Sequence, residues 1–296
     1  MANQATPIGN ETRQGTQPSK LEPGLYVVAT PIGNLGDLSE RARMVLSSAE
    51  IIACEDSRVT GKLLRHLGCQ AKFLPYHDHN AARVRPKLLA MLDAGGALAL
   101  VTDAGTPCIA DPGFKLVRAA HEMGVVVHAV PGPSAVIAAL SVAGLPTDRF
   151  FFQGFLPIQP AKRRRVLASL AHIPGTLVFY ETANRLVRQL EDCRDILGSR
   201  DAVILRELTK LYEETIRGTL PELVEQLAAR GQLKGEIVVL VGPPPDEVLD
   251  DEEIDRLLLE ALKSNGPSAA AADVAARSGR SRSALYKRAL ALQSAT

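Results

Sequence analysis

From Gly24 to Gly242 the chain alternates short aliphatic and β-branched runs with longer amphipathic stretches. Short apolar runs bounded by Gly, Pro or acidic residues predict strands, and apolar residues recurring every three or four positions predict helices. In the first half, strands are predicted near 25–30, 50–54, 72–75, 97–102 and 125–130, and helices near 39–49, 57–67, 80–94, 112–123 and 133–143. This alternation predicts a mainly parallel sheet with helices on its faces.

A second set of alternating elements follows the Gly144–Thr147 turn. Strands are predicted near 149–154, 175–180, 201–206, 212–218 and 236–241, and helices near 160–172, 184–197 and 220–230. We therefore expect two α/β lobes, an N-terminal lobe over 23–145 and a C-terminal lobe over 146–243. A ligand cleft is expected between them, since ligand sites often lie where two domains meet.

The pattern changes after the stiff Pro243–Pro245 spacer. Eight acidic residues fall between Asp246 and Glu260, whereas none follows Asp273. Short helices are predicted near 250–264, 268–277 and 281–292, which is typical of a helix-turn-helix module that docks on nucleic acid, here over 250–294. At the other end, residues 1–22 are polar and without periodicity, so this tail is expected to be disordered.

Charge and cysteine content narrow the classes of function. The 34 Lys and Arg residues nearly balance the 33 Asp and Glu residues, so any affinity for RNA must come from local basic patches. No apolar run approaches the ~20 residues of a membrane span, and residues 1–20 lack the apolar core of a signal peptide, so the expected location is the cytoplasm. The four cysteines are scattered without C-x-x-C spacing and predict neither a zinc site nor disulfides.

Three predicted strands end in small, cyclic or acidic residues at positions 30–35, 103–107 and 131–135. Ligands of open α/β sheets bind outside the carboxyl ends of strands, so these corners predict a small-molecule site and an enzyme. Gly105 would allow a ligand close to the backbone, Asp103 offers acceptors, and a helix starting at Ser134 offers free N–H groups. The first corner lacks the G-x-G-x-x-G spacing of a dinucleotide cradle.

Glu55, Asp56 and Arg58 directly follow another predicted strand. One of the two carboxylates could deprotonate an acceptor hydroxyl while Arg58 binds a phosphate, or Asp56 could simply cap the next helix. Charged residues also follow strands of the second lobe, in the segments 179–181, 184–185 and 206–207.

Two further patterns carry weaker signals. His77 and His79 have H-x-H spacing, but two histidines cannot complete a metal site, so no metal is expected. The basic run Lys162–Arg165 opens a predicted helix and is either a solvated face or a contact to an RNA backbone.

Five ordered motifs together resemble a known family. They span residues 30–37, 103–107 with 111–113, 131–135, 179–181 and 206–210. They resemble the tetrapyrrole-methylase superfamily of S-adenosylmethionine (SAM) enzymes and, within it, the branch of small-subunit rRNA (cytidine-2′-O)-methyltransferases. Most tetrapyrrole methylases carry a Gly-x-Gly-x-Gly-Asp type of turn at the first motif. The Thr30–Leu35 version is that of the rRNA branch and disfavours a porphyrinoid substrate.

The resemblance implies two αβα-sandwich lobes of the tetrapyrrole-methylase type, SAM as cofactor and a homodimer. It also implies a substrate, the ribose 2′-hydroxyl of a cytidine (cytidine 1402) in 16S rRNA of the small ribosomal subunit. The residues expected to bind SAM are Pro31, Asp103, Gly105, Ile109, Ser134, Ala135, Tyr180, Leu208 and Ile237. Those expected to bind RNA are Lys162, Arg163, Arg164, Arg185, Arg277, Arg280, Arg282, Lys287 and Arg288.

Two alternatives remain open at this point. The same sheet could serve a tetrapyrrole or precorrin methyltransferase, although the first motif and the basic C-terminal segment count against it. The chain could also be a non-catalytic nucleic-acid binder in which the lobes only sense SAM. Methyl transfer to small ribosomal subunits, compared with a tetrapyrrole acceptor, would separate these functions.

Overall fold

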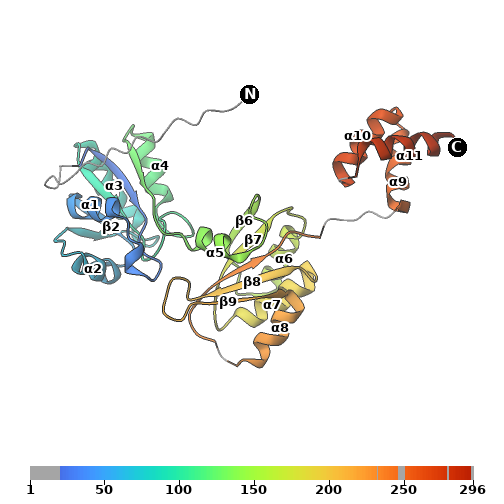
Figure 1. The fold of residues 1–296 in the computed structure, drawn as a ribbon. Coiled ribbons are helices and arrows are strands. Elements are labelled where there is room, and N and C mark those ends of the chain that lie inside the picture. Colours follow the sequence, from blue (N-terminus) through green and yellow to red (C-terminus); the bar gives the residue numbers. More distant parts are fainter. Residues whose placement is uncertain (1–20, 232, 246–250, 279, 295–296) are drawn as a thin grey trace. The chain divides into compact units, whose positions relative to one another are not determined.

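The computed structural model describes residues 21–231, 233–245, 251–278 and 280–294. The tail predicted to be disordered lies outside this part of the chain, apart from its last two residues. The chain forms two compact units, one of residues 1–170 and 175–242 and one of residues 171–174 and 243–296. Both α/β lobes belong to the first unit, and the helical module belongs to the second (Figure 1).

The first lobe is built on a five-stranded sheet of order β3-β2-β4-β1-β5, whose strands pair in parallel. The strands are β1 (Gly24–Val28), β2 (Ile51–Cys54), β3 (Phe73–Pro75), β4 (Ala97–Leu100) and β5 (Val127–Val130). The helices that connect them are α1 (Glu40–Ser48), α2 (Ser57–His66), α3 (Ala81–Asp93) and α4 (Phe114–Glu122). All were predicted, whereas the short 3-10 helix η1 (Leu35–Asp37) was not.

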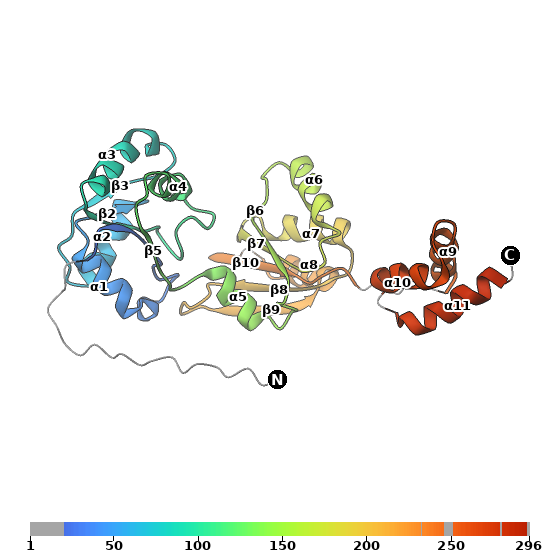
Figure 2. The same cartoon turned by 90° about the horizontal axis from the view of Figure 1, so that it is seen from above.

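Alternation along the buried strands divides the core of this lobe into two layers. Tyr26 and Val28 pack with residues of α1 and α2 on one face of the sheet. Leu25 packs with residues of α3 and α4 on the other face. Successive strand side chains point to opposite faces, so the parallel sheet is covered on both sides (Figure 2).

The second lobe has a mixed sheet of order β6-β7-β10-β8-β9. Its strands are β6 (Phe150–Phe155), β7 (Thr176–Thr182), β8 (Asp201–Arg206), β9 (Glu214–Thr219) and β10 (Glu236–Val241). Only β6 and β7 pair in parallel, and the other three pairings are antiparallel. The loop from β8 to β9 is too short for a helical crossover, and such strands pair as an antiparallel hairpin.

Helices cover both faces of this second sheet. The helices α6 (Pro160–Leu170), α7 (Leu186–Leu197) and α8 (Leu220–Ala229) lie together on one face (Figure 2). The helix α5 (Ala135–Ala143) packs on the other face through Val136, Ala139 and Leu140. The border expected at residue 145 would place α5 with the first lobe, but its apolar surface is buried by the second sheet.

The second unit is a three-helix module of α9 (Asp251–Leu262), α10 (Pro267–Ser278) and α11 (Arg282–Ser294). Its small core includes Ile254, Leu258, Val274 and Leu285. The three predicted helices agree with these bounds to within a few residues. Across the described residues, every helix is too short or too polar to cross a membrane.

Candidate active site

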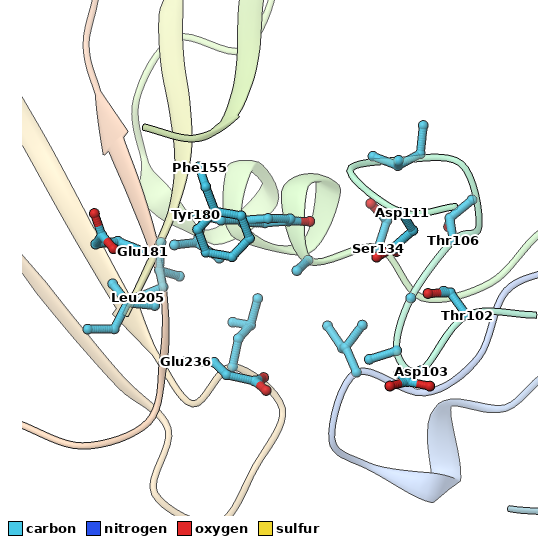
Figure 3. Close-up of a pocket in the computed structure, with 18 of the residues that line it drawn as sticks. Thr102, Asp103, Thr106, Asp111, Ser134, Phe155, Tyr180, Glu181, Leu205 and Glu236 are labelled. Atoms are coloured by element: carbon cyan, nitrogen blue, oxygen red, sulfur yellow. The ribbon is translucent and has the colours of Figure 1, made fainter. Parts of the chain in front are cut away.

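A cavity of about 330 Å³ opens within the first unit at the carboxyl ends of the first sheet's strands. One wall comes from the first lobe and the start of α5, and the opposite wall comes from the second lobe (Figure 3). The lining residues include Ile32, Glu55, Thr102–Thr106, Ile109, Asp111, Ser134, Ala135, Phe155, Tyr180–Thr182, Leu205, Leu208 and Gly235–Val238. We call this cavity the inter-lobe pocket.

The loop between β4 and α4 forms much of the first wall. Gly105 and Thr30 exchange backbone hydrogen bonds of 2.8 and 3.0 Å, and Gly105 adopts a φ of 83°. Further along the loop, Cys108 and Ala110 have φ values of 71° and 62°, a region that side chains other than Gly rarely occupy. Such backbone strain is typical of functional sites, because the surrounding structure must hold the loop in place.

Three carboxyl groups lie on this wall. The Thr102 hydroxyl donates to Glu55 Oε2 at 2.7 Å, and the Asp56 backbone N–H donates to Asp103 Oδ1 at 3.0 Å. Burial raises the pKa of Asp103, and burial together with the nearby Glu55 and Asp103 raises the pKa of Asp111 to about 6. Asp111 was not among the residues chosen from the sequence, although it opens the Asp-Pro-Gly part of the second motif.

The opposite wall presents aromatic rings. Tyr180 lies edge-on to Phe152 and Phe155, with ring centroids 4.9 and 5.6 Å apart. Burial raises the pKa of Tyr180 to about 12, so its phenol stays neutral at ordinary pH. Figure 3 shows Tyr180 and Phe155 across the pocket from Thr102, Asp103 and Asp111.

The loop after β8 completes this wall and is also strained. Glu207 and Thr209 have φ values of 50° and 67° on either side of Leu208, which lines the pocket. Lys210 pairs with Glu207 at 3.0 Å and with Glu236 at 2.9 Å. Carbon atoms of its side chain lie where a Cβ on Gly33 would stand, so this lysine covers the glycine of the first motif.

The pocket's chemistry fits SAM. The Ser134 side chain does not cap α5, so the first-turn N–H groups are left for a ligand carboxylate. Ile32, Leu208 and Ile237 offer an apolar surface suited to adenine. Carboxylates on the other side suit a positively charged sulfonium.

Eight of the nine residues expected to bind SAM line the inter-lobe pocket, namely Asp103, Gly105, Ile109, Ser134, Ala135, Tyr180, Leu208 and Ile237. Pro31 is not among the lining residues, and its neighbour Ile32 takes that place. The pocket also gathers Thr102, Asp111 and Phe155, which sequence reasoning did not select. Their role depends on the contact between lobes, which no local pattern reveals.

The three residues expected to be catalytic separate in the structure. Glu55 lines the pocket, but Asp56 and Arg58 are not among its lining residues. Asp56 caps α2 by accepting the Arg58 backbone N–H at 2.8 Å, and it pairs with the Arg58 guanidinium at 2.6 Å. These hydrogen bonds lower the pKa of Asp56 to about 2, which makes it a weak proton acceptor. The capping alternative is the better description of Asp56.

The basic run at the start of α6 is only partly a surface patch. Arg163 is buried and pairs with Asp192 at 2.6 Å, so the expectation that it binds RNA is corrected. Arg164 is half-exposed but pairs with Asp192 at 2.8 Å, while Lys162 is exposed. Arg185 pairs with the buried Glu181 at 3.3 Å and donates to the Leu156 carbonyl at 2.7 Å.

In the helical module, two of the basic residues expected to bind RNA hold the helices together. Arg280 pairs with Asp251 at 2.6 Å, and Arg288 pairs with both Asp251 and Asp255. Arg282 and Lys287 are exposed, and Arg282 donates to the Ser268 hydroxyl at 3.2 Å. The side chain of Arg277 lies outside the described part of the chain.

Within that same part of the chain, no group of three or more His, Cys, Asp or Glu side chains could hold a metal ion. The rings of His77 and His79 form a T-shaped contact with centroids 6.0 Å apart. The four cysteines are free thiols.

Solved structures that are similar to this chain carry the same fold. A cobalt precorrin-4 methyltransferase is 19% identical, with a TM-score of 0.54 over 74% of this chain and 94% of its own. A uroporphyrin-III C-methyltransferase from Thermus thermophilus, complexed with S-adenosyl homocysteine, is 20% identical, with a TM-score of 0.51 over 74% and 97%. At this level of identity the likeness establishes the fold alone.

Sequence relatives are much more similar. The family Tetrapyrrole (Corrin/Porphyrin) Methylases matches residues 24–224, and the RsmI C-terminal HTH domain matches residues 248–293. Proteins named ribosomal RNA small subunit methyltransferase I are 46% identical in Mesorhizobium japonicum (92% of this chain, 93% of that protein) and 45% identical in Escherichia coli O157:H7 (91% and 95%). The chain therefore belongs to the tetrapyrrole methylases and, within them, to the ribosomal RNA small subunit methyltransferase I family.

Proposed function

We propose that this protein transfers a methyl group from SAM to the 2′-hydroxyl of a cytidine in the rRNA of the small ribosomal subunit. Methylation of small-subunit rRNA with SAM is supported by the matched family and by the names of the relatives. The observation that carries it is 46% identity over 92% of the chain, because a match of that extent includes both lobes and the helical module. The choice of the ribose 2′-oxygen and of a cytidine as the target goes beyond what the names of the relatives state.

Bound SAM would supply a methyl group on a sulfonium, a good leaving group that needs no covalent help from the protein. The chain's own residues have two tasks, to align the hydroxyl with the methyl group and to take up the hydroxyl proton. The start of α5 and the apolar residues of the inter-lobe pocket hold the cofactor. The aromatic rings of Tyr180 and Phe155 are side chains of the type on which an exposed base stacks.

The test is transfer of tritium from methyl-labelled SAM to small ribosomal subunits that lack the modification, with a tetrapyrrole acceptor in parallel. We expect label in the rRNA only. Alkaline hydrolysis then identifies the oxygen, because a methylated 2′-hydroxyl cannot attack the neighbouring phosphate and leaves a resistant dinucleotide. Label in the tetrapyrrole, or rRNA label in fully alkali-sensitive nucleotides, contradicts the proposal.

The protein is further proposed to act as a cytoplasmic homodimer. Support for the dimer comes from the resemblance to the superfamily, and support for the location comes from the substrate, since ribosomal subunits are cytoplasmic. Sedimentation equilibrium of the full chain tests the dimer, and a monomer mass at micromolar concentration contradicts it.

A further inference from the structure

The reaction proposed above releases a proton from the 2′-hydroxyl, and several acidic groups surround the inter-lobe pocket. Six titratable acids line it in the two walls, namely Glu55, Asp103, Asp111, Tyr180, Glu181 and Glu236. A proton acceptor must face the pocket, keep a carboxylate oxygen available and titrate close to the working pH.

Five of these groups already hold other contacts or are poorly matched. Glu55 accepts the Thr102 hydroxyl through Oε2, and Asp103 accepts the Asp56 backbone N–H through Oδ1. Glu236 pairs with Lys210 at 2.9 Å. Glu181 Oε1 accepts the Thr182 backbone N–H at 2.7 Å and pairs with Arg185, and Figure 3 shows its carboxylate on the far side of Tyr180 from Asp111. The Tyr180 phenol stays protonated at ordinary pH, so it cannot accept the proton.

Asp111 lies on the opposite wall, directly after the strained residues Cys108 and Ala110. The Thr102 hydroxyl interacts with its carboxyl group. The single proton of that hydroxyl is donated to Glu55 Oε2. The Asp111 carboxylate therefore keeps acceptor capacity toward the pocket.

We propose that Asp111 is the residue that accepts the proton of the ribose 2′-hydroxyl, a role that rests on the function proposed above. The hydroxyl oxygen forms its bond to the methyl carbon, and the carbon–sulfur bond breaks with its electron pair remaining on sulfur. The O–H bond breaks at the same time, and its proton moves to an Asp111 carboxylate oxygen. Asp111 then returns the proton to solvent.

The electrostatic surroundings match this role. Glu55 from the end of β2, Asp103 from the end of β4, Cys108 from the same loop and Tyr180 from β7 are the titratable groups that interact with Asp111, and all are neutral or negative at pH 7. Burial, together with Glu55 and Asp103, raises the pKa of Asp111 to about 6. A carboxylate with that pKa is mostly ionised at neutral pH and is a stronger base than an ordinary aspartate.

The experiment measures single-turnover methylation of small subunits by the full chain from about pH 5 to 8. SAM is kept well below its dissociation constant, so that the pH profile reports the ionisation of the free protein. In the parent protein the rate should rise with a single ionisation near pH 6 and then level off. In Asp111→Asn the rate should fall by ~10²–10⁴ and the ionisation should disappear, while SAM affinity by calorimetry stays within a few-fold. Asp93→Asn, at the exposed end of α3, is the matched control and should behave as the parent.

The outcomes separate the two proposals. A parent protein that methylates no small subunit overturns the proposed function, and this inference with it. A parent that methylates with a rate independent of pH from about 5 to 8 overturns the role of Asp111 without any variant. An active parent with an Asp111→Asn variant of equal rate and equal profile overturns it as well.

Discussion

At the scale of single residues, Gly105 shows how local backbone shape opens a site. Its φ of 83° is natural for glycine and strained for other residues, and a Cβ would lie 3.4 Å from Ile32 Cγ2. The absent side chain leaves this part of the pocket wall open to a ligand. Two effects therefore act on any substitution here, one on the backbone and one on the pocket.

Gly105→Leu should abolish measurable SAM binding by calorimetry, because the new side chain occupies the pocket wall. Left-handed strain alone should cost about 1–2 kcal/mol of stability. Gly124→Leu is the control, since Gly124 has a φ of 73° and nothing within 4 Å of an added Cβ. Equal loss of stability with loss of SAM binding only in Gly105→Leu is expected, and unchanged affinity in Gly105→Leu contradicts this placement of the cofactor.

Asp111 should lower the stability of the protein at neutral pH. Its pKa is about 6 in the folded chain against 3.8 for an ordinary aspartate, so the unfolded state loses the proton first as pH rises. Stability is unaffected below about pH 4, falls between about pH 4 and 6, and stays lower above that range. Asp111→Asn should be more stable than the parent by on the order of 1–3 kcal/mol above pH 6 and should equal it near pH 3.5.

Urea unfolding followed by circular dichroism at both pH values measures this difference. The control is again Asp93→Asn, which should show no such dependence on pH. If the variant is less stable than the parent at neutral pH, the Asp111 carboxylate stabilises the folded protein, which contradicts this prediction.

At the scale of elements, buried ion pairs join helices where the sequence suggested a surface patch. Arg163 of α6 and Asp192 of α7 have side chains only 8% and 10% exposed and lie 2.6 Å apart. Four consecutive basic residues, 162–165, lie in the first turns of α6. Arg163 points inward because the helical period turns it toward α7. Sequence composition could not distinguish it from its neighbours.

Arg163→Ala should lower the free energy of unfolding by about 3 kcal/mol, at the low end for an unpaired buried charge because Arg164 still contacts Asp192. Lys162→Ala, one position earlier and exposed, is the control and should change stability little. Chemical unfolding of both variants is the measurement. An Arg163→Ala variant with the stability of the parent and weaker RNA binding would contradict this expectation. It would indicate that Arg163 contacts RNA.

The strand pairings of the second lobe are another property of elements. Each strand was placed close to its observed bounds, yet the alternation of strands and helices did not reveal that β7, β10, β8 and β9 pair antiparallel. Register and direction depend on which strands become neighbours in space. The helix α5 likewise joined the second sheet because its apolar residues are buried there.

At the scale of the whole molecule, the helical module and the two lobes are separate compact units. Ion pairs from Arg280 and Arg288 to acidic residues of α9 neutralise part of the module's positive charge. Contacts to phosphate are therefore expected mainly from exposed residues such as Arg282 and Lys287.

The double variant Arg282→Ala with Lys287→Ala should weaken rRNA binding and flatten its dependence on salt. Losing two phosphate contacts should reduce the slope of log K against log salt concentration by ~1.4–1.8. SAM affinity should not change, because the inter-lobe pocket belongs to the other unit. Arg256→Ala on α9 with Lys263→Ala directly after it is a control of equal charge. An equal loss of slope there would show that only the module's net charge matters.

The sequence by itself determined the element order, the helical module, the family and many residues that line the inter-lobe pocket. These follow from local periodicity, from turn chemistry at strand ends and from motifs, which short stretches of chain encode. Only the tertiary structure decided that Asp56 caps a helix while Asp111 faces the pocket, that Arg163 is buried and that α5 covers the second sheet. Burial, ion pairing and a raised pKa arise between segments distant along the chain, so they exist only once the two lobes have folded around their shared pocket.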